Sequence, residues 1–189
     1  MANLTSAERS RRSDILAAAQ REFAAAGFSG GRIERIAAAA DVNKQLLFHY
    51  FDSKQGLFRS ALEELLSRSE PPAENPGDQP ADEVRRVVGA VQATVQSHPG
   101  LLGIIADATA NDGFPPDAAA SVRAWRDRLR NRLENALAEG QRRGYFRDDI
   151  DPSAVARAAL AAALGTGALG ERDAGVPIGS LLLDYCAWR

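Results

Sequence analysis

The chain has little of what disulfide-bonded, zinc-binding or membrane proteins require. Its single cysteine, Cys186, permits no internal disulfide, and one Cys with two His cannot form a structural zinc site from Cys and His alone. The most apolar stretch, residues 154–170, contains Arg157 and is mainly Ala and Gly, which is too weakly apolar for a membrane span. The first residues are basic but lack the apolar segment of a secretory signal. We therefore expect a soluble, cytoplasmic protein.

Aromatic residues make up only 6% of the chain, while alanine is abundant. A core of Ala, Leu and Val suits close-packed helices better than a sheet, whose positions favour β-branched and aromatic residues. No segment has the apolar–polar alternation of a half-buried strand, and apolar residues recur with helical spacing instead. The sequence predicts an all-α fold with about nine helices.

One boundary is visible in the composition. Residues 69–80 contain four Pro and one Gly, so they cannot continue a helix and are predicted to form a linker. Residues 1–68 carry ten Lys or Arg against eight Asp or Glu, a net charge of +2. The remaining 121 residues carry thirteen against seventeen, a net charge of −4. The basic front part is a weak indication of nucleic-acid binding.

The front part has the spacing of four helices. Gly27 is predicted to end the first, and residues 33–40 carry the apolar face of a short second helix. Asn43 is a good N-cap for a third helix that ends at residue 50 or 51. Asp52 and Gln55 have capping-box spacing, which predicts Asp52 as the N-cap of a fourth helix.

The second and third helices have the proportions of a helix-turn-helix. Leu47 and Phe51 are predicted to face the interior, with Val42 below them. The opposite face offers side chains that suit a phosphate or guanine, an adenine and a thymine methyl: Lys44, Gln45, Phe48 and His49. Lys54 is placed for a phosphate contact. From the residues alone, the solvated helix face of any helical protein explains this pattern equally well.

Residues 10–60 contain a series of motifs in a familiar order and spacing. They are Gly27-Phe28, Ile36-Ala37, Val42-Asn43-Lys44 and Leu47-Phe48-His49-Tyr50-Phe51-x-Ser53-Lys54-x-x-Leu57. This series resembles the N-terminal domain of the TetR (tetracycline-repressor-like) family of bacterial transcription regulators. The resemblance implies a homodimer that docks one helix-turn-helix on each half of a palindromic operator. It implies DNA contacts at Arg32, Asn43, Lys44, Gln45, Phe48, His49, Tyr50 and Lys54.

The chain departs from the family pattern at several positions. Gly31-Arg32 stands where Thr-Thr or Thr-Ser is common, so we expect Gly31 to cap the second helix through its backbone and Arg32 to replace the lost phosphate contact. Asp41 stands where the turn usually has Gly, and Asp tolerates a positive φ with some strain. Gln45-Leu46 replaces a common Gly-Thr, and Phe48 a common Tyr. The operator therefore cannot be inferred from relatives.

The resemblance divides the chain into a DNA-binding domain (1–52), a connecting helix (53–68), the linker (69–80) and a regulatory and dimerisation domain (81–189). We expect an apolar small molecule to bind within the C-terminal helices and release the DNA. The candidate pocket residues are Leu62, Leu66, Val88, Ile105, Phe114, Trp125 and Leu129, although ordinary core packing explains each of them. The dimer interface is predicted on residues 152–168 and 177–188, with Ala158, Ala161, Ala162, Gly165, Leu181, Leu182, Tyr185 and Trp188.

Two other functions compete with a ligand-controlled repressor. A DNA-binding protein without an effector requires only that the C-terminal core be filled. A helical enzyme lacks support, because the sequence has no nucleophile–base constellation, no metal-ligand spacing and no phosphate loop. The G-x-G-x-x-G match at 165–170 follows a helix instead of a strand, so close helix packing explains it better than dinucleotide binding. No metal or cofactor is expected, and Cys186 is interpreted as a packing residue.

Overall fold

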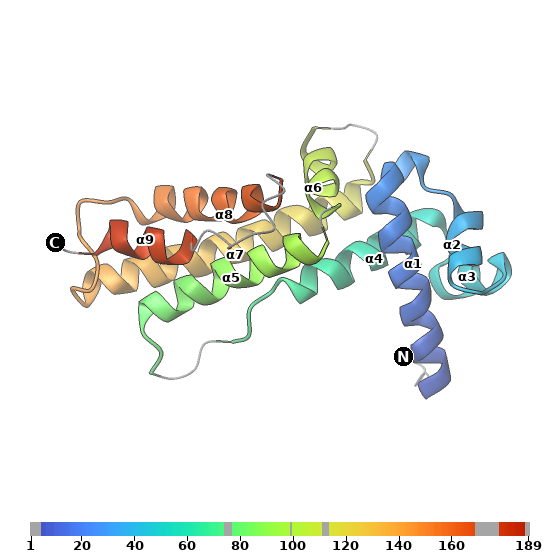
Figure 1. Ribbon diagram of the computed structural model, residues 1–189, viewed down its shortest axis with the longest axis horizontal. Helices are drawn as coiled ribbons and strands as arrows, with labels where there is room; N and C mark the ends of the chain where they lie inside the picture. The colour runs from blue at the N-terminus through green and yellow to red at the C-terminus, as the bar shows by residue number, and fades with distance from the viewer. Residues whose placement is uncertain (1–4, 74–76, 99, 111–113, 169–177, 188–189) are drawn as a thin grey trace. The chain divides into compact units, whose positions relative to one another are not determined.

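The computed structural model describes residues 5–73, 77–98, 100–110, 114–168 and 178–187. Within these ranges the chain forms nine helices and no strand, which confirms the all-α prediction. A single antiparallel bridge joins Phe146 to Ala187. The helices, coloured in chain order in Figure 1, are α1 (Ser6–Gly30), α2 (Ile33–Ala39), α3 (Lys44–Phe51), α4 (Lys54–Arg68), α5 (Pro80–Ser97), α6 (Leu101–Ala110), α7 (Pro116–Arg142), α8 (Pro152–Ala168) and α9 (Ile178–Cys186).

The chain divides into two compact units. Unit 1 contains Met1–Leu66 and Gly103–Val122, and unit 2 contains Ser67–Leu102 and Arg123–Arg189. The first unit thus combines α1, α2, α3 and most of α4 with a segment drawn from α6 and α7. The predicted boundaries at 52, 68 and 80 follow sequence order and remain a prediction.

Helix α1 begins at a capping box and is kinked near its end. The Thr5 hydroxyl accepts from the Glu8 backbone N at 3.3 Å, and the Glu8 carboxylate accepts from the Thr5 backbone N at 2.7 Å. Gly27 has a φ of 67° and a ψ of 178°, which interrupts the regular helix where the sequence predicted its end. Three further residues follow the kink, so α1 extends to Gly30.

Unit 1 is held together by phenylalanine rings. Phe23 of α1 meets Phe58 of α4 edge to face, with 4.9 Å between ring centroids. Phe58 also contacts Phe28 at 5.1 Å and Phe114 at 5.3 Å. A buried aromatic ring contributes about 2–3 kcal/mol through burial. These four rings therefore hold α1 against α4, and α2 packs against α1 and α3.

Helix α4 begins one residue later than the sequence predicted. Asp52 is not its N-cap: it has a φ of 59° and ends α3, with its backbone N donating to Phe48 O at 2.8 Å. Ser53 caps α4 instead, since its hydroxyl accepts from the Gly56 backbone N at 3.0 Å. The capping-box spacing was misleading because the chain must reverse at Asp52, which leaves that residue outside the extended conformation of an N-cap.

In unit 2, α5 packs against α8 and α9, and α8 packs against α9. Val84, Val87, Val88, Val91 and Val95 of α5 are all buried, which confirms the helix face read from their spacing. Figure 1 shows α5, α7, α8 and α9 running nearly lengthwise beside one another. Helix α4 ends at Arg68, and α5 begins at Pro80 with proline at its first turn.

The first linker residues are bound to α7 by polar contacts within unit 2. The buried Trp125 indole donates to the Ser69 hydroxyl at 2.7 Å. The Arg132 guanidinium donates to the carbonyls of Pro71 and Pro72, each at 2.8 Å, and its Nε donates to the Glu83 carboxylate at 2.6 Å. These contacts hold residues 69–72, which lie outside any helix.

Glu83 is the centre of a buried charge cluster. Its side chain is only 2% exposed and pairs with both Arg132 and Arg86. Arg86 also pairs with Asp78. Desolvation is the largest single influence on the pKa of Arg86 and lowers it, but the Asp78 and Glu83 carboxylates together outweigh it, so the pKa is raised. A buried carboxylate requires such partners, because burying an unpaired charge costs several kcal/mol of folding free energy. Removing one partner of a buried pair typically lowers stability by about 3–5 kcal/mol.

Candidate DNA-binding surface

The turn between α2 and α3 has the geometry of a helix-turn-helix. Asp41 has a φ of 52°, which confirms that it occupies the left-handed position usually taken by glycine. The Val42 backbone N donates to Ala37 O at 3.0 Å and closes the turn. Asn43 caps α3 as predicted, with its side-chain oxygen accepting from the Leu46 backbone N at 2.8 Å. The cap and the turn fix the direction in which α3 leaves α2.

The inner face of α3 is anchored in unit 1. Leu47 is completely buried and Phe51 is 4% exposed, as their spacing predicts, while Val42 is half-buried. The Arg12 guanidinium of α1 lies 5.4 Å from the centroid of the Phe51 ring, a cation–π contact. Helix α2 packs against both α1 and α3. Helix α3 is therefore held by α2 and by the contact of Arg12 with Phe51.

The outer face of α3 is open to solvent. Lys44, Gln45 and His49 are exposed, and the large apolar side chain of Phe48 is 39% exposed. Tyr50 is half-buried beside His49, with 5.8 Å between ring centroids. A cation, an amide, an aromatic ring and an imidazole thus share one short exposed helix face.

Both lysines among the predicted DNA contacts have partners within unit 1. Lys44 forms an ion pair with Glu34 of α2, and this hydrogen bond lowers the pKa of the Glu34 carboxyl below its ordinary value. The Lys54 ammonium donates to Ser29 O at 3.1 Å and lies 5.0 Å from the centroid of the Phe28 ring. Lys54 is half-buried, so it also joins the start of α4 to the end of α1.

The expected role of Gly31 is wrong. It does not cap α2: it ends α1, with its backbone N donating to Gly27 O at 3.1 Å. The N-cap of α2 is Arg32, whose side chain makes no capping hydrogen bond and is exposed. A Cβ at position 31 would lie 2.6 Å from the Phe23 ring, so Gly31 is required for packing. The Arg32 backbone N donates to the Glu22 carboxylate at 3.1 Å.

Glu34 is the residue near this surface that the sequence did not reveal. It lies ten positions before Lys44 and on a different helix, so the periodicity within one helix does not relate the two. The two side chains meet only because α2 and α3 pack together across the turn. Once the helix-turn-helix is recognised, the acidic residue in the first turn of α2 is the signal that could have found it.

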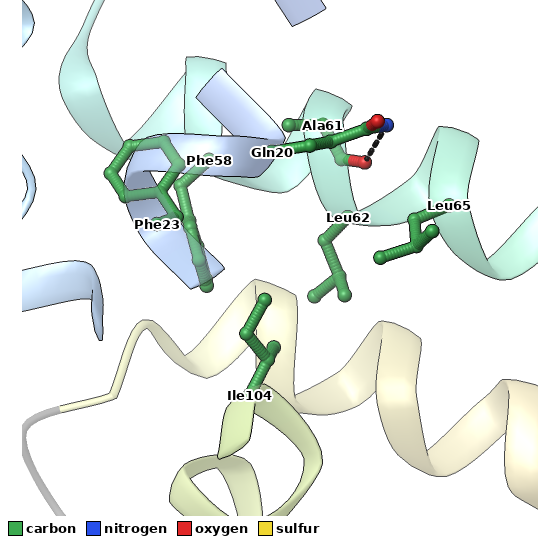
Figure 2. A pocket seen from close by; sticks show the side chains of 7 residues that line it. All are labelled: Gln20, Phe23, Phe58, Ala61, Leu62, Leu65 and Ile104. Carbon is green, nitrogen blue, oxygen red and sulfur yellow. Dashed lines mark hydrogen bonds between the residues drawn. The ribbon is translucent and has the colours of Figure 1, made fainter. Parts of the chain in front are cut away.

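The seven predicted effector-pocket residues are all buried. Four of them belong to unit 1, namely Leu62, Leu66, Ile105 and Phe114. The other three belong to unit 2, namely Val88, Trp125 and Leu129. Leu62 lines an apolar pocket within unit 1 (Figure 2), together with Gln20, Phe23, Phe58, Ala61, Leu65 and Ile104. Figure 2 shows these apolar side chains pointing toward one another, and the pocket encloses about 10 Å³. That space admits about one water molecule.

The predicted dimer residues lie on the exposed sides of α8 and α9. Ala158, Ala161 and Ala162 are exposed and Gly165 is half-buried. On α9, Leu181 is 56% and Tyr185 is 60% exposed, while Leu182 is half-buried. Trp188 lies outside the described residues. Small side chains are thus exposed on α8 and large apolar ones on α9.

Cys186 is completely buried, and desolvation raises the pKa of its thiol, an effect that nearby Arg147 opposes. This environment agrees with a packing residue. Among the described residues, no group of three or more His, Cys, Asp or Glu is arranged to hold a metal ion. None of the described helices combines the length and the apolar character needed to cross a membrane.

Two family models match the chain. Residues 15–61 match the model described as bacterial regulatory proteins, tetR family, and residues 80–170 match the tetracyclin repressor-like C-terminal domain. The HTH-type transcriptional repressor NicS of Pseudomonas putida is 32% identical over 142 residues, which span 74% of this chain and 67% of NicS. The HTH-type transcriptional repressor SCO4008 of Streptomyces coelicolor is 53% identical over 49 residues, about a quarter of each protein.

Solved structures share the fold over most of the chain. A linker-substituted mutant of HlyIIR superposes with a TM-score of 0.78 at 18% identity, covering 96% of this chain and 97% of that one. AibR, crystallised with isovaleryl coenzyme A and operator DNA, superposes with a TM-score of 0.69 at 19% identity, covering 94% and 98%. At these identities the likeness concerns the fold.

Proposed function

Because this chain belongs to the TetR family of bacterial transcription regulators, it is a DNA-binding regulator, and we propose that it acts as a homodimeric repressor of a palindromic operator. The observation that carries this proposal is the exposed outer face of α3 opposite the buried Leu47 and Phe51. A recognition helix needs one face for its own domain and one for the major groove. Helix α3 has both.

The side chains on that face divide into two kinds of DNA contact. Gln45 can make a bidentate contact with adenine and Phe48 can meet a thymine methyl, so these two discriminate between base pairs. Lys44, Arg32 and Lys54 are cations for phosphate, which fix the position of the helix on the duplex. We assign Asn43, His49 and Tyr50 to the same surface, with Asn43 also serving as the cap of α3.

Selection of bound duplexes from a random DNA pool tests the proposal. We expect a palindrome whose half-sites lie about one helical turn apart, about 34–36 Å, because two equivalent recognition helices must enter the groove on one side of the duplex. Recovery of a single unpaired half-site would contradict the dimeric arrangement. Recovery of no preferred sequence would contradict the proposed role of α3.

Replacing Gln45 with alanine is expected to relax the preference at one base pair in each half-site. The loss of a bidentate contact removes about 1–3 kcal/mol of discrimination while the phosphate contacts persist. The measurement is the affinity for the selected operator and for its single-base variants. Gln96, an exposed glutamine on α5, provides the matched control Gln96→Ala, which should leave all of these affinities unchanged. A uniform loss across all sequences would show that Gln45 contacts no base.

We place the dimer interface on the exposed sides of α8 and α9. The small residues of α8 allow a second helix to approach closely, and Leu181 and Tyr185 supply apolar area to bury. In a two-fold interface the same surface of each subunit meets the other. Each interface residue therefore lies near the same residue of the partner subunit or near one of the residues beside it.

Ala158→Arg is therefore expected to weaken the dimer by at least about tenfold, because two bulky charges would enter one apolar interface. Sedimentation over a range of concentrations measures this change. The control is Ala93→Arg, the same substitution at an exposed alanine of α5. Equal dissociation constants for the two variants would remove α8 from the interface.

Release of the DNA by an apolar effector is the second part of the proposal. An effector site is supported by the family's C-terminal domain. AibR, which shares the fold, was crystallised in complex with isovaleryl coenzyme A and operator DNA, so a protein of this fold binds both a small molecule and DNA. The pocket in Figure 2 encloses about 10 Å³, whereas ligand pockets commonly enclose about 300–1,000 Å³, so an effector would need another site. The other candidate is a DNA-binding protein without an effector. A panel of apolar small molecules, tested for binding and for operator affinity, separates the two.

Coupling between the two sites is reciprocal. A compound that weakens operator binding by some factor must itself bind the operator complex more weakly by the same factor. A compound that binds the protein without any change in operator affinity contradicts the release mechanism. The assignment of α3 as the recognition helix does not depend on this result.

A further inference from the structure

The chain has two lysines, Lys44 and Lys54, and their surroundings differ in charge. The partners of Lys54 are the Ser29 carbonyl and the face of the Phe28 ring, neither of which carries a net charge. Lys44 instead forms an ion pair with the carboxylate of Glu34. Of these two cations, Lys44 is therefore the one whose charge is locally compensated by the protein.

Glu34 lies beside two of the cations proposed to meet phosphate. Its side chain is 63% exposed and that of Lys44 is 49% exposed. The positive charge of Arg32 also acts on the Glu34 carboxyl, although the Lys44 hydrogen bond has the larger influence on its pKa. A phosphate that approaches the start of α3 must thus compete with a carboxylate that already holds the lysine.

The outcome of this competition depends on how closely the DNA docks. An exposed ion pair is weak, so a phosphate in direct contact with the ammonium can displace Glu34. A phosphate separated from the protein by water is screened and cannot displace it. Closely docked operator DNA and loosely bound random DNA should therefore use Lys44 to different extents.

We propose that Glu34 is a specificity-determining residue. It keeps Lys44 in an ion pair when DNA is loosely bound, and a phosphate of the closely docked operator displaces it. This inference rests on the proposed DNA-binding function of α3. Phosphate contacts add affinity for every sequence equally. By suppressing one such contact in non-specific complexes, Glu34 increases the ratio of operator affinity to non-specific affinity.

The experiment compares Glu34→Gln with the unsubstituted chain on a short random-sequence duplex and on the selected operator, over a range of salt concentrations. For random DNA we expect about three- to tenfold tighter binding. The slope of log affinity against log salt should become steeper by about two units per dimer, one for each released lysine. For the operator we expect a smaller gain of about twofold, because Lys44 already contacts phosphate there and the substitution removes only the cost of breaking a weak, exposed ion pair. An equal gain on both duplexes would overturn the proposal.

A double-mutant cycle with Lys44→Ala separates competition for Lys44 from simple repulsion of DNA by a carboxylate. In the Lys44→Ala background, Glu34→Gln should change random-duplex affinity by less than about twofold. An undiminished gain there would show that Glu34 acts on DNA directly. Asp14→Asn makes the same change of charge at an exposed position of α1 and should leave the affinity ratio unchanged. Helical content and the thermal midpoint establish that each variant is folded.

The two levels of the proposal fail in different ways. An unsubstituted protein that binds neither duplex at low salt would contradict the proposed function itself. Normal operator binding combined with an undiminished gain in the Lys44→Ala background would contradict only the role of Glu34.

Discussion

Alanine in place of Gly56 is expected to lower the free energy of unfolding by about 3 kcal/mol, the upper end of the usual cost of overpacking, and to abolish operator binding. A Cβ at this position would lie 2.3 Å from the carbonyl oxygen of Phe51, which is backbone and cannot rotate away. Phe51 is the last residue of α3 and one of its two buried anchors. Relief of the clash must therefore move the recognition helix relative to α4.

Urea denaturation followed by circular dichroism measures the stability, and the selected operator measures binding. Gly89 is the matched control, since it is an exposed glycine within α5 with no atom near its would-be Cβ. Gly89→Ala should raise stability by about 0.5–1 kcal/mol, as alanine does in an unobstructed helix. If both substitutions stabilised the chain, the close approach between Gly56 and Phe51 would be wrong.

Arg132→Ala is expected to lower the free energy of unfolding by about 3 kcal/mol, because it leaves the buried Glu83 carboxylate with one partner fewer. Arg86 still pairs with Glu83 in this variant, which keeps the loss near the lower end of that range. The substitution also removes the donors to the carbonyls of Pro71 and Pro72. The start of the linker should accordingly become more accessible to proteolysis.

Arg128 provides the comparison, because it lies one turn earlier on α7 and pairs with Glu70 at the surface. The two side chains of that pair are 56% and 39% exposed. Arg128→Ala should cost less than about 1 kcal/mol, as exposed ion pairs do. Similar losses for the two arginines, measured by urea denaturation, would mean that burial of Glu83 has little influence on stability.

Local sequence patterns were sufficient for much of the fold. The cap at Asn43, the positive φ at Asp41 and the burial of Leu47 and Phe51 were all predicted correctly. These features depend on neighbours within a few residues, where spacing and turn chemistry are informative. Proline acts in the same local way on the backbone that contains it, and Pro80 stands in the first turn of α5.

The errors and omissions concern contacts between segments distant in sequence. The need for glycine at position 31 comes from the ring of Phe23, and capping patterns do not contain that information. The pairing of Arg132 with Glu83 joins residues 49 positions apart, and that of Lys44 with Glu34 depends on the angle between two helices. Periodicity shows that such side chains are exposed or buried, but it does not identify their partners.

The distribution of chromophores between the two units has a practical consequence. The buried Trp125 belongs to unit 2, whereas the segments of unit 1 contain no tryptophan and a single tyrosine, Tyr50. Emission excited selectively in the indole band therefore records the melting of unit 2 alone. A fluorophore attached to DNA records the state of unit 1, so the two signals can be followed in one sample to learn whether the halves of the chain unfold together.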